Sequence, residues 1–176
     1  MRIRFPRLAD GRRSYSVVER SDGVRFRVRQ GVAGPAIPHD LVHLVVDREL
    51  GEDGGFWGAV AAGAVFASMD HLDGRRPPHS ERRSIEVIRG RSGRLHRAEM
   101  VAELVQLCAR RRMTTPDQVR RAAREVLATL PDSAVDERRV AAAAEALRET
   151  ELRWAALPVG EELVVDWPEG HSRRRR

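Results

Sequence analysis

The chain is poor in several residue types, and each shortage excludes a class of protein. Its 176 residues include one cysteine, Cys108, so an internal disulfide framework is excluded. Cys108 falls at helical spacing among Val101, Leu104 and Val105, which predicts that it packs as a small apolar residue. A single unpaired cysteine also indicates a reducing compartment. The longest uncharged run, residues 54–69, is shorter than the roughly 20 apolar residues that a bilayer-spanning helix needs.

The first residues, MRIRFPRLADGRR, also lack the apolar stretch of a secretory signal. Together with the reduced cysteine, this absence predicts a cytoplasmic protein with no membrane span.

Lysine and asparagine are absent altogether, so all 32 basic residues are arginine. Such a composition follows from GC-rich coding without any selection for binding anions. Residues 173–176 supply four of the formal charges in the net +6, which leaves +2 on the rest of the chain. Aromatic residues are only 5% of the total, too few for a base-stacking surface. Nucleic acid is therefore not the expected partner, despite the high isoelectric point.

Alternating patterns at the two ends of the chain predict β-strands. Ile3 and Phe5 alternate with arginines, and residues 15–20 and 24–29 flank a Ser-Asp-Gly turn. The Asp-Gly step supplies the positive φ of a tight hairpin. Residues 162–167 alternate again, and an isolated strand would leave its backbone unpaired. We expect this last strand to join the N-terminal hairpin in a small antiparallel sheet.

The middle of the chain predicts a block of about five helices. They are expected at residues 39–50, 56–72, 95–112, 116–130 and 134–157. Thr115 before Gln118, and Ser133 before Asp136, mark the last two helix starts as capping sequences. Residues 73–93 are polar and predict a loop or lid, with one short strand around Ile85, Val87 and Ile88. The fold class is therefore α+β, a single globular domain over residues 1–170 with a disordered arginine tail at 171–176.

The most suggestive chemistry is the pattern His39-Asp40-x-x-His43 at the start of the first helix. Residues four apart lie one turn apart on the same side, where two imidazoles can bind one metal ion. The positive end of the helix dipole favours the neutral imidazole that ligates metals. Asp47 continues the same line by another turn. The expected cofactor is a divalent metal ion such as zinc.

A two-histidine site needs at least one further ligand. Asp47 and Glu49 on the same helix are candidates, as are Asp70, His71 and Asp73 at the predicted end of the next helix. If the two helices run antiparallel, the end of the second returns toward the start of the first. That geometry makes Asp70 and His71 the preferred supplementary ligands, with Asp47 beside them.

The pattern resembles the zinc-peptidase signature His-Glu-x-x-His, with aspartate in place of glutamate. The resemblance implies that His39 and His43 are ligands and that Asp40 is a catalytic base acting on a metal-bound water. The pattern is also similar to the metal-binding His-Asp-x-x-His of a ubiquinone-biosynthesis protein family. The wider pattern, residues 38–43 followed by Phe56-Trp57-Gly58, resembles a family of uncharacterised bacterial proteins, and that likeness implies no activity.

Two hypotheses of different classes stay open on the sequence. In the first, the chain is a metal-dependent protein whose candidate activity is hydrolysis, with Asp40 as base or as an orienting residue. In the second, it is a non-enzymatic interaction or regulatory protein whose histidines satisfy a buried polar network. Its partner would be an unidentified small molecule or protein, and the last long helix also leaves a homo-oligomer open.

Overall fold

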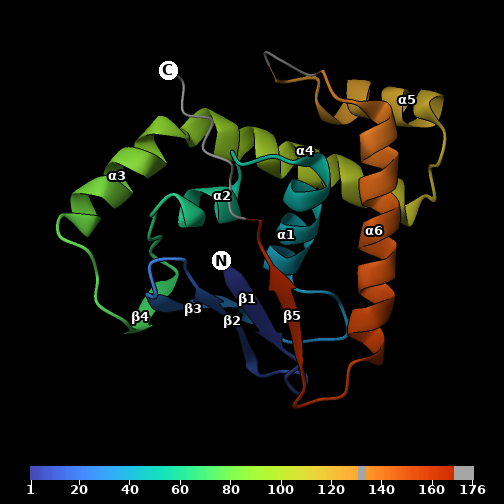
Figure 1. The fold of residues 1–176 in the computed structure, drawn as a ribbon. Helices are drawn as coiled ribbons and strands as arrows, with labels where there is room; N and C mark the ends of the chain where they lie inside the picture. The colour runs from blue at the N-terminus through green and yellow to red at the C-terminus, as the bar shows by residue number, and fades with distance from the viewer. Residues whose placement is uncertain (131–133, 169–176) are drawn as a thin grey trace.

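The computed structural model describes residues 1–130 and 134–168, and its strands form one antiparallel sheet in the order β4-β3-β2-β1-β5. The strands are β1 Arg2–Pro6, β2 Arg13–Glu19, β3 Arg25–Val32, β4 Met69–Asp73 and β5 Glu162–Asp166. Figure 1 shows the helices gathered above the sheet and along one side of it. The predicted α+β class is therefore confirmed.

The β2–β3 hairpin forms where the alternation predicts it. Its turn places Gly23 at a φ of 76°, a conformation that glycine adopts without strain. The Asp22 side chain accepts a hydrogen bond from the Val24 amide at 3.2 Å, which fixes the turn locally. Val18 and Phe26 lie opposite each other and are buried in the core.

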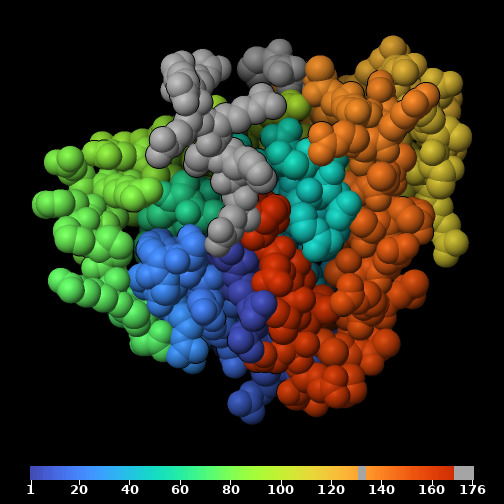
Figure 2. Space-filling model, in the orientation of Figure 1, coloured from blue at the N-terminus to red at the C-terminus, as the bar shows by residue number. Residues whose placement is uncertain are grey.

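The C-terminal strand joins the N-terminal strands in one antiparallel sheet, as predicted, but its neighbour there is β1 and not a strand of the hairpin. Arg2 lies opposite Asp166 and Phe5 opposite Leu163, so the first and last strands are antiparallel neighbours. In Figure 2 the blue N-terminal residues and the red residues of β5 lie side by side on the surface.

In the described part of the chain, six helices complete the fold. They are α1 His39–Leu50, α2 Phe56–Ala61, α3 Ser80–Gly90, α4 Ser92–Arg110, α5 Pro116–Val126 and α6 Glu137–Ala156. Helix α1 packs against both α4 and α6, with α2 beside it (Figure 1). Most of its girth is apolar and buried, so its few polar side chains are held in fixed places.

Local signals explain why α1 begins and ends where it does. Pro38 precedes the first turn, and Asp40 places a carboxylate at the positive end of the helix dipole. At the other end Gly51 adopts the left-handed conformation with a φ of 66°. The Glu52 amide donates to the Asp47 carbonyl at 2.8 Å, which closes the helix with a Schellman-type bond.

One of the two predicted capping sequences is confirmed in full. Thr115 and Gln118 form a capping box at the start of α5, with Pro116 in the first turn. Helix α6 begins at Glu137 and is capped by Asp136, whose side chain accepts hydrogen bonds from the amides of Arg138 and Arg139. Ser133, the other predicted cap, lies outside the described residues, as does the predicted tail.

The prediction of one helix over residues 56–72 is wrong. Helix α2 ends at Ala61, and the chain turns at Gly63 with a φ of 106°. Met69–Asp73 then forms β4, which pairs with β3 and extends the sheet. The uncharged small residues of this run suit a helix locally, but the open edge of β3 offers backbone hydrogen bonds that decide the outcome.

The prediction of a loop with one short strand over residues 73–93 is also wrong. The segment contains α3, which is almost fully exposed, and the start of α4. Only Ser84 of α3 is buried; its hydroxyl accepts from the Val65 amide at 2.8 Å and donates to the Val65 carbonyl at 3.2 Å. Its apolar residues, Ile85, Val87 and Ile88, are too few and too closely spaced to distinguish a helix from a short strand.

Among the described residues, no helix combines the length and the apolar character needed to cross a membrane.

Candidate metal centre

Helices α1 and α4 together position the candidate ligands. His39 and His43 occupy successive turns on one side of α1, and α4 packs against this helix. Glu99, on α4, faces both imidazoles. These three residues are the group of potential metal ligands in the described part of the chain.

The distances within this group suit a single metal ion. Nε2 of His39 and Nε2 of His43 lie 3.3 Å apart, and Oε2 of Glu99 lies 3.2 Å from His43 Nε2 and 3.9 Å from His39 Nε2. A tetrahedral ion with metal–ligand distances of about 2.0–2.1 Å places its ligand atoms roughly 3.3 Å apart. The three atoms therefore span one face of such a tetrahedron with little adjustment.

The group is anchored on one side and open on the other. The His43 side chain is only 4% exposed, whereas those of His39 and Glu99 are 66% and 59% exposed. An ion bound by all three would keep its remaining coordination position toward solvent. Catalytic zinc sites differ from structural ones in this respect, because structural sites close all four positions with protein ligands.

The two imidazoles titrate differently because their surroundings differ. Burial lowers the pKa of His43, so this ring is held in the neutral form that ligates metals. The carboxylate of Asp40, and next that of Glu99, raise the pKa of His39.

Asp40 is tied to its neighbours through both carboxylate oxygens. Oδ1 lies 3.8 Å from His39 Nδ1, on the side of the ring away from the ligating nitrogen. Oδ2 accepts a hydrogen bond from Gln30 Nε2 at 3.1 Å, and Ser14 in turn donates to Gln30 at 3.2 Å. The carbonyl of Asp40 accepts from Trp57 Nε1 at 2.8 Å. This arrangement suits a residue that orients His39, because a carboxylate beside Nδ1 fixes the ring and its tautomer.

Asp47, the third residue of the line along α1, is buried one turn beyond His43. It is not part of the His39/His43/Glu99 group. Its Oδ2 has no hydrogen-bond partner among the described residues, and burial raises its pKa to about 7, with Glu52 and Glu99 adding to the rise.

Asp70 and His71 lie on β4, because the second helix that was to return them to His39 does not form. Asp70 pairs with Arg29 at 3.0 Å, and Nε2 of His71 lies 2.9 Å from the Gly74 carbonyl oxygen. The His71 ring packs edge-on against Phe26. The predicted antiparallel helix pair, which was to bring Asp70 and His71 to His39, is therefore wrong.

Glu99 is the ligand candidate that sequence reasoning missed. It lies inside a predicted helix that also carries Glu103, and no local pattern distinguishes the two acids. Only the packing of α4 against α1 brings Glu99 to the histidines, so the sequence near Glu99 carries no signal of its role.

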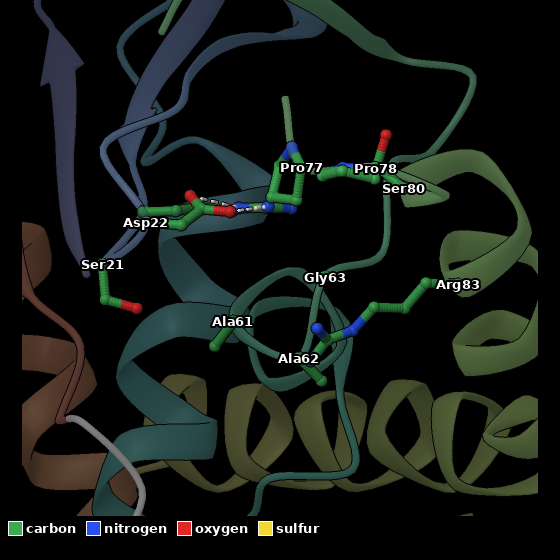
Figure 3. A pocket seen from close by; sticks show the side chains of 10 residues that line it. Ser21, Asp22, Ala61, Ala62, Gly63, Pro77, Pro78, Ser80 and Arg83 are labelled. Carbon is green, nitrogen blue, oxygen red and sulfur yellow. Dashed lines mark hydrogen bonds and ion pairs between the residues drawn. The ribbon is translucent and has the colours of Figure 1, made fainter. Parts of the chain in front are cut away.

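A separate hollow of about 190 Å³ lies between the β2–β3 turn and the start of α3 (Figure 3). Asp22 in its wall is already paired with Arg20, and the Arg83 side chain lies over Gly63. None of the described residues that line this hollow has a buried side-chain nitrogen or oxygen without a hydrogen-bond partner. The described lining therefore contains no unpartnered polar group that would indicate a ligand site.

Comparisons with models of protein families, with curated proteins and with solved structures found no match to this chain. Its function must be argued from its own residues.

Proposed function

We propose that the protein binds a divalent metal ion, zinc in the first instance, through His39 Nε2, His43 Nε2 and Glu99. The observation that carries the proposal is that one ligand atom from each residue lies within 4.8 Å of the others, across two packed helices. Two imidazoles and a carboxylate are a donor set that zinc binds well.

We further propose hydrolysis as the reaction class. Three protein ligands that include two histidines and a glutamate leave one position for water, and a zinc ion there lowers the pKa of that water to about 7. The exposure of His39 and Glu99 supports access of a substrate to this position. In this proposal Asp40 orients the His39 ring from its Nδ1 side. The contacts of Asp40 with Gln30 and His39 support an orienting role and not the role of a catalytic base.

Metal uptake by purified, untagged protein tests the proposal. We expect one equivalent of zinc by elemental analysis, and a tetrahedral absorption spectrum after replacement with cobalt. His39→Ala and Glu99→Gln should each weaken zinc binding by more than about 100-fold, since loss of an outer partner alone costs roughly 10- to 100-fold. Both side chains are largely exposed, so both variants should fold.

His96→Ala is the matched control, because His96 is an exposed histidine of α4 outside the ligand group. It should keep full zinc affinity. If wild-type protein takes up no metal, or if His96→Ala loses metal as readily as His39→Ala, the proposal fails. The three residues would then form only a hydrogen-bonded network, as the interaction-protein hypothesis requires.

Asp40→Asn separates the two roles proposed for Asp40. As an orienting residue, Asp40 should affect zinc affinity, and we expect the variant to bind zinc about 10- to 100-fold more weakly. A catalytic base would instead leave zinc affinity unchanged and lower the turnover of a model ester. Chelator competition measures the first quantity and ester hydrolysis the second.

A further inference from the structure

A cavity of about 330 Å³ lies between α1, the turn after it and α4. Its volume is at the lower end of the range for small-molecule sites, about 300–1,000 Å³. It is lined by Asp47, Glu52, Asp53, Gly54, Gly55, Arg94, Arg97, Ala98 and Val101. Neither the histidines nor Glu99 line it, so it is distinct from the metal centre.

Asp47 is the unusual member of this lining. The residue is 2% exposed, and its Oδ2 is buried without a hydrogen-bond partner in the described structure. A buried carboxylate without donors is costly, and native proteins rarely leave one unsatisfied. The charges that raise its pKa further, those of Glu52 and Glu99, are both acidic and make its ionisation harder still.

The backbone is shaped to accommodate this carboxylate. Gly55 has a φ of −78°, which any residue could adopt, so backbone conformation does not require glycine there. A Cβ at Gly55, however, would lie 2.1 Å from Asp47 Oδ2. Glycine is needed at this position so that the acid can lie directly against the chain.

Two arginines of α4, Arg94 and Arg97, line the cavity. The aliphatic part of Arg94 packs along Gly54, and Arg94 makes no ion pair with a described residue. Arg97 also lines the cavity, but it donates to the Ala134 carbonyl at 2.8 Å. Arg94 is therefore the arginine of the described lining that has no ion-pair partner among the described residues, and a guanidinium can bind a carboxylate through two parallel hydrogen bonds.

We propose that this cavity binds a small zwitterion of the amino-acid class, with its ammonium on Asp47 and its carboxylate on Arg94. An ammonium supplies both the positive charge and the N–H donors that Asp47 lacks. A purely anionic ligand would face Asp47, Glu52 and Asp53 in the same lining. This site shares no residue with the proposed metal centre.

Isothermal titration with matched probes tests the assignment. Glycine and 4-aminobutyrate are the zwitterions, and n-butylamine and butyrate each keep one of the two charged groups. We expect at least one zwitterion to bind wild-type protein, and both single-charge probes to bind about 10-fold or more weakly. Asp47→Asn and Arg94→Gln should each reduce zwitterion affinity by about 10- to 100-fold, the usual effect of losing a charged hydrogen bond.

Glu103→Gln is the control variant, because Glu103 is an exposed acid of α4 that does not line the cavity. It should bind like wild type, and so should His39→Ala, which removes a metal ligand only. Absence of binding by both zwitterions would overturn the proposal. Equal binding of n-butylamine and 4-aminobutyrate would overturn the role of Arg94 and the zwitterion assignment with it.

Discussion

Asp47→Asn should stabilise the protein at neutral and alkaline pH and have little effect near pH 4. Burial raises the pKa of Asp47 from 3.8 to about 7. At 1.36 kcal/mol for each pKa unit, ionising this buried group costs about 4 kcal/mol. Asparagine has nearly the same shape and carries no charge, so it avoids that cost.

The direction of the pH dependence follows from proton binding. Between pH 3.8 and about 7 the folded state keeps a proton on Asp47 that the unfolded state has lost. The free energy of unfolding contributed by this group therefore falls as pH rises through that window, and it is level above it. The Asn variant lacks this decline, so its advantage over wild type grows from pH 4 to pH 7 and then stays constant.

Urea unfolding followed by circular dichroism between pH 4 and pH 9 measures this difference. Asp73 and Asp166, whose pKa values are lowered by paired arginines, lose their stabilising effect as pH falls in both proteins. Subtracting the two curves removes that shared trend. A constant difference across the whole range would show that Asp47 does not titrate in this window.

Trp57→Ala should cost about 3–5 kcal/mol of stability, the usual cost of removing a buried tryptophan. Trp57 is fully buried, and its ring packs edge-on against Phe5 of β1 and Phe56 of α2. Its Nε1 donates to the Asp40 carbonyl at 2.8 Å, in the first turn of α1. Because His39 lies in that same turn, we also expect Trp57→Ala to weaken zinc binding.

Trp154 provides the matched control for this effect. It is also buried, but its Nε1 has no hydrogen-bond partner among the described residues and it lies on α6. Trp154→Ala should lower the unfolding free energy by a similar amount and leave zinc affinity unchanged in the folded protein. Urea titration and chelator competition measure the two quantities. Equal losses of zinc affinity in both variants would mean that Trp57 acts through general stability alone.

The parts of the fold that the sequence predicts are those with strong local patterns. The hairpin around Gly23 and the boundaries of α1 follow from turn chemistry and hydrophobic spacing. Strand β4 does not, because its pairing with β3 depends on residues about 40 positions earlier, as the Arg27–Asp70 register shows. Helix α3 was not predicted because its three apolar residues, Ile85, Val87 and Ile88, fit a short strand as well as a helix.

The candidate site also has one part that the sequence predicts and one part that it does not. His39 and His43 share a helix, so their juxtaposition follows from their spacing of four residues. Glu99 comes from a different helix and reaches them only through tertiary packing. Asp70 and His71 were predicted as ligands from an assumed pair of antiparallel helices. In the structure both residues lie on strand β4 of the sheet. Spacing within one element is thus informative, whereas spacing across two elements requires the fold.

The pairing of β1 with β5 also constrains the order in which the protein can fold during synthesis. Arg2 leaves the ribosome well before its partner Asp166, which is translated after α1, α4 and α6. One edge of β1 therefore stays open to other strands throughout that interval, and exposed edges are sites of aggregation. Contacts so distant in sequence slow folding as well. Closure of this edge by β5 is expected to be a late step in forming the native sheet.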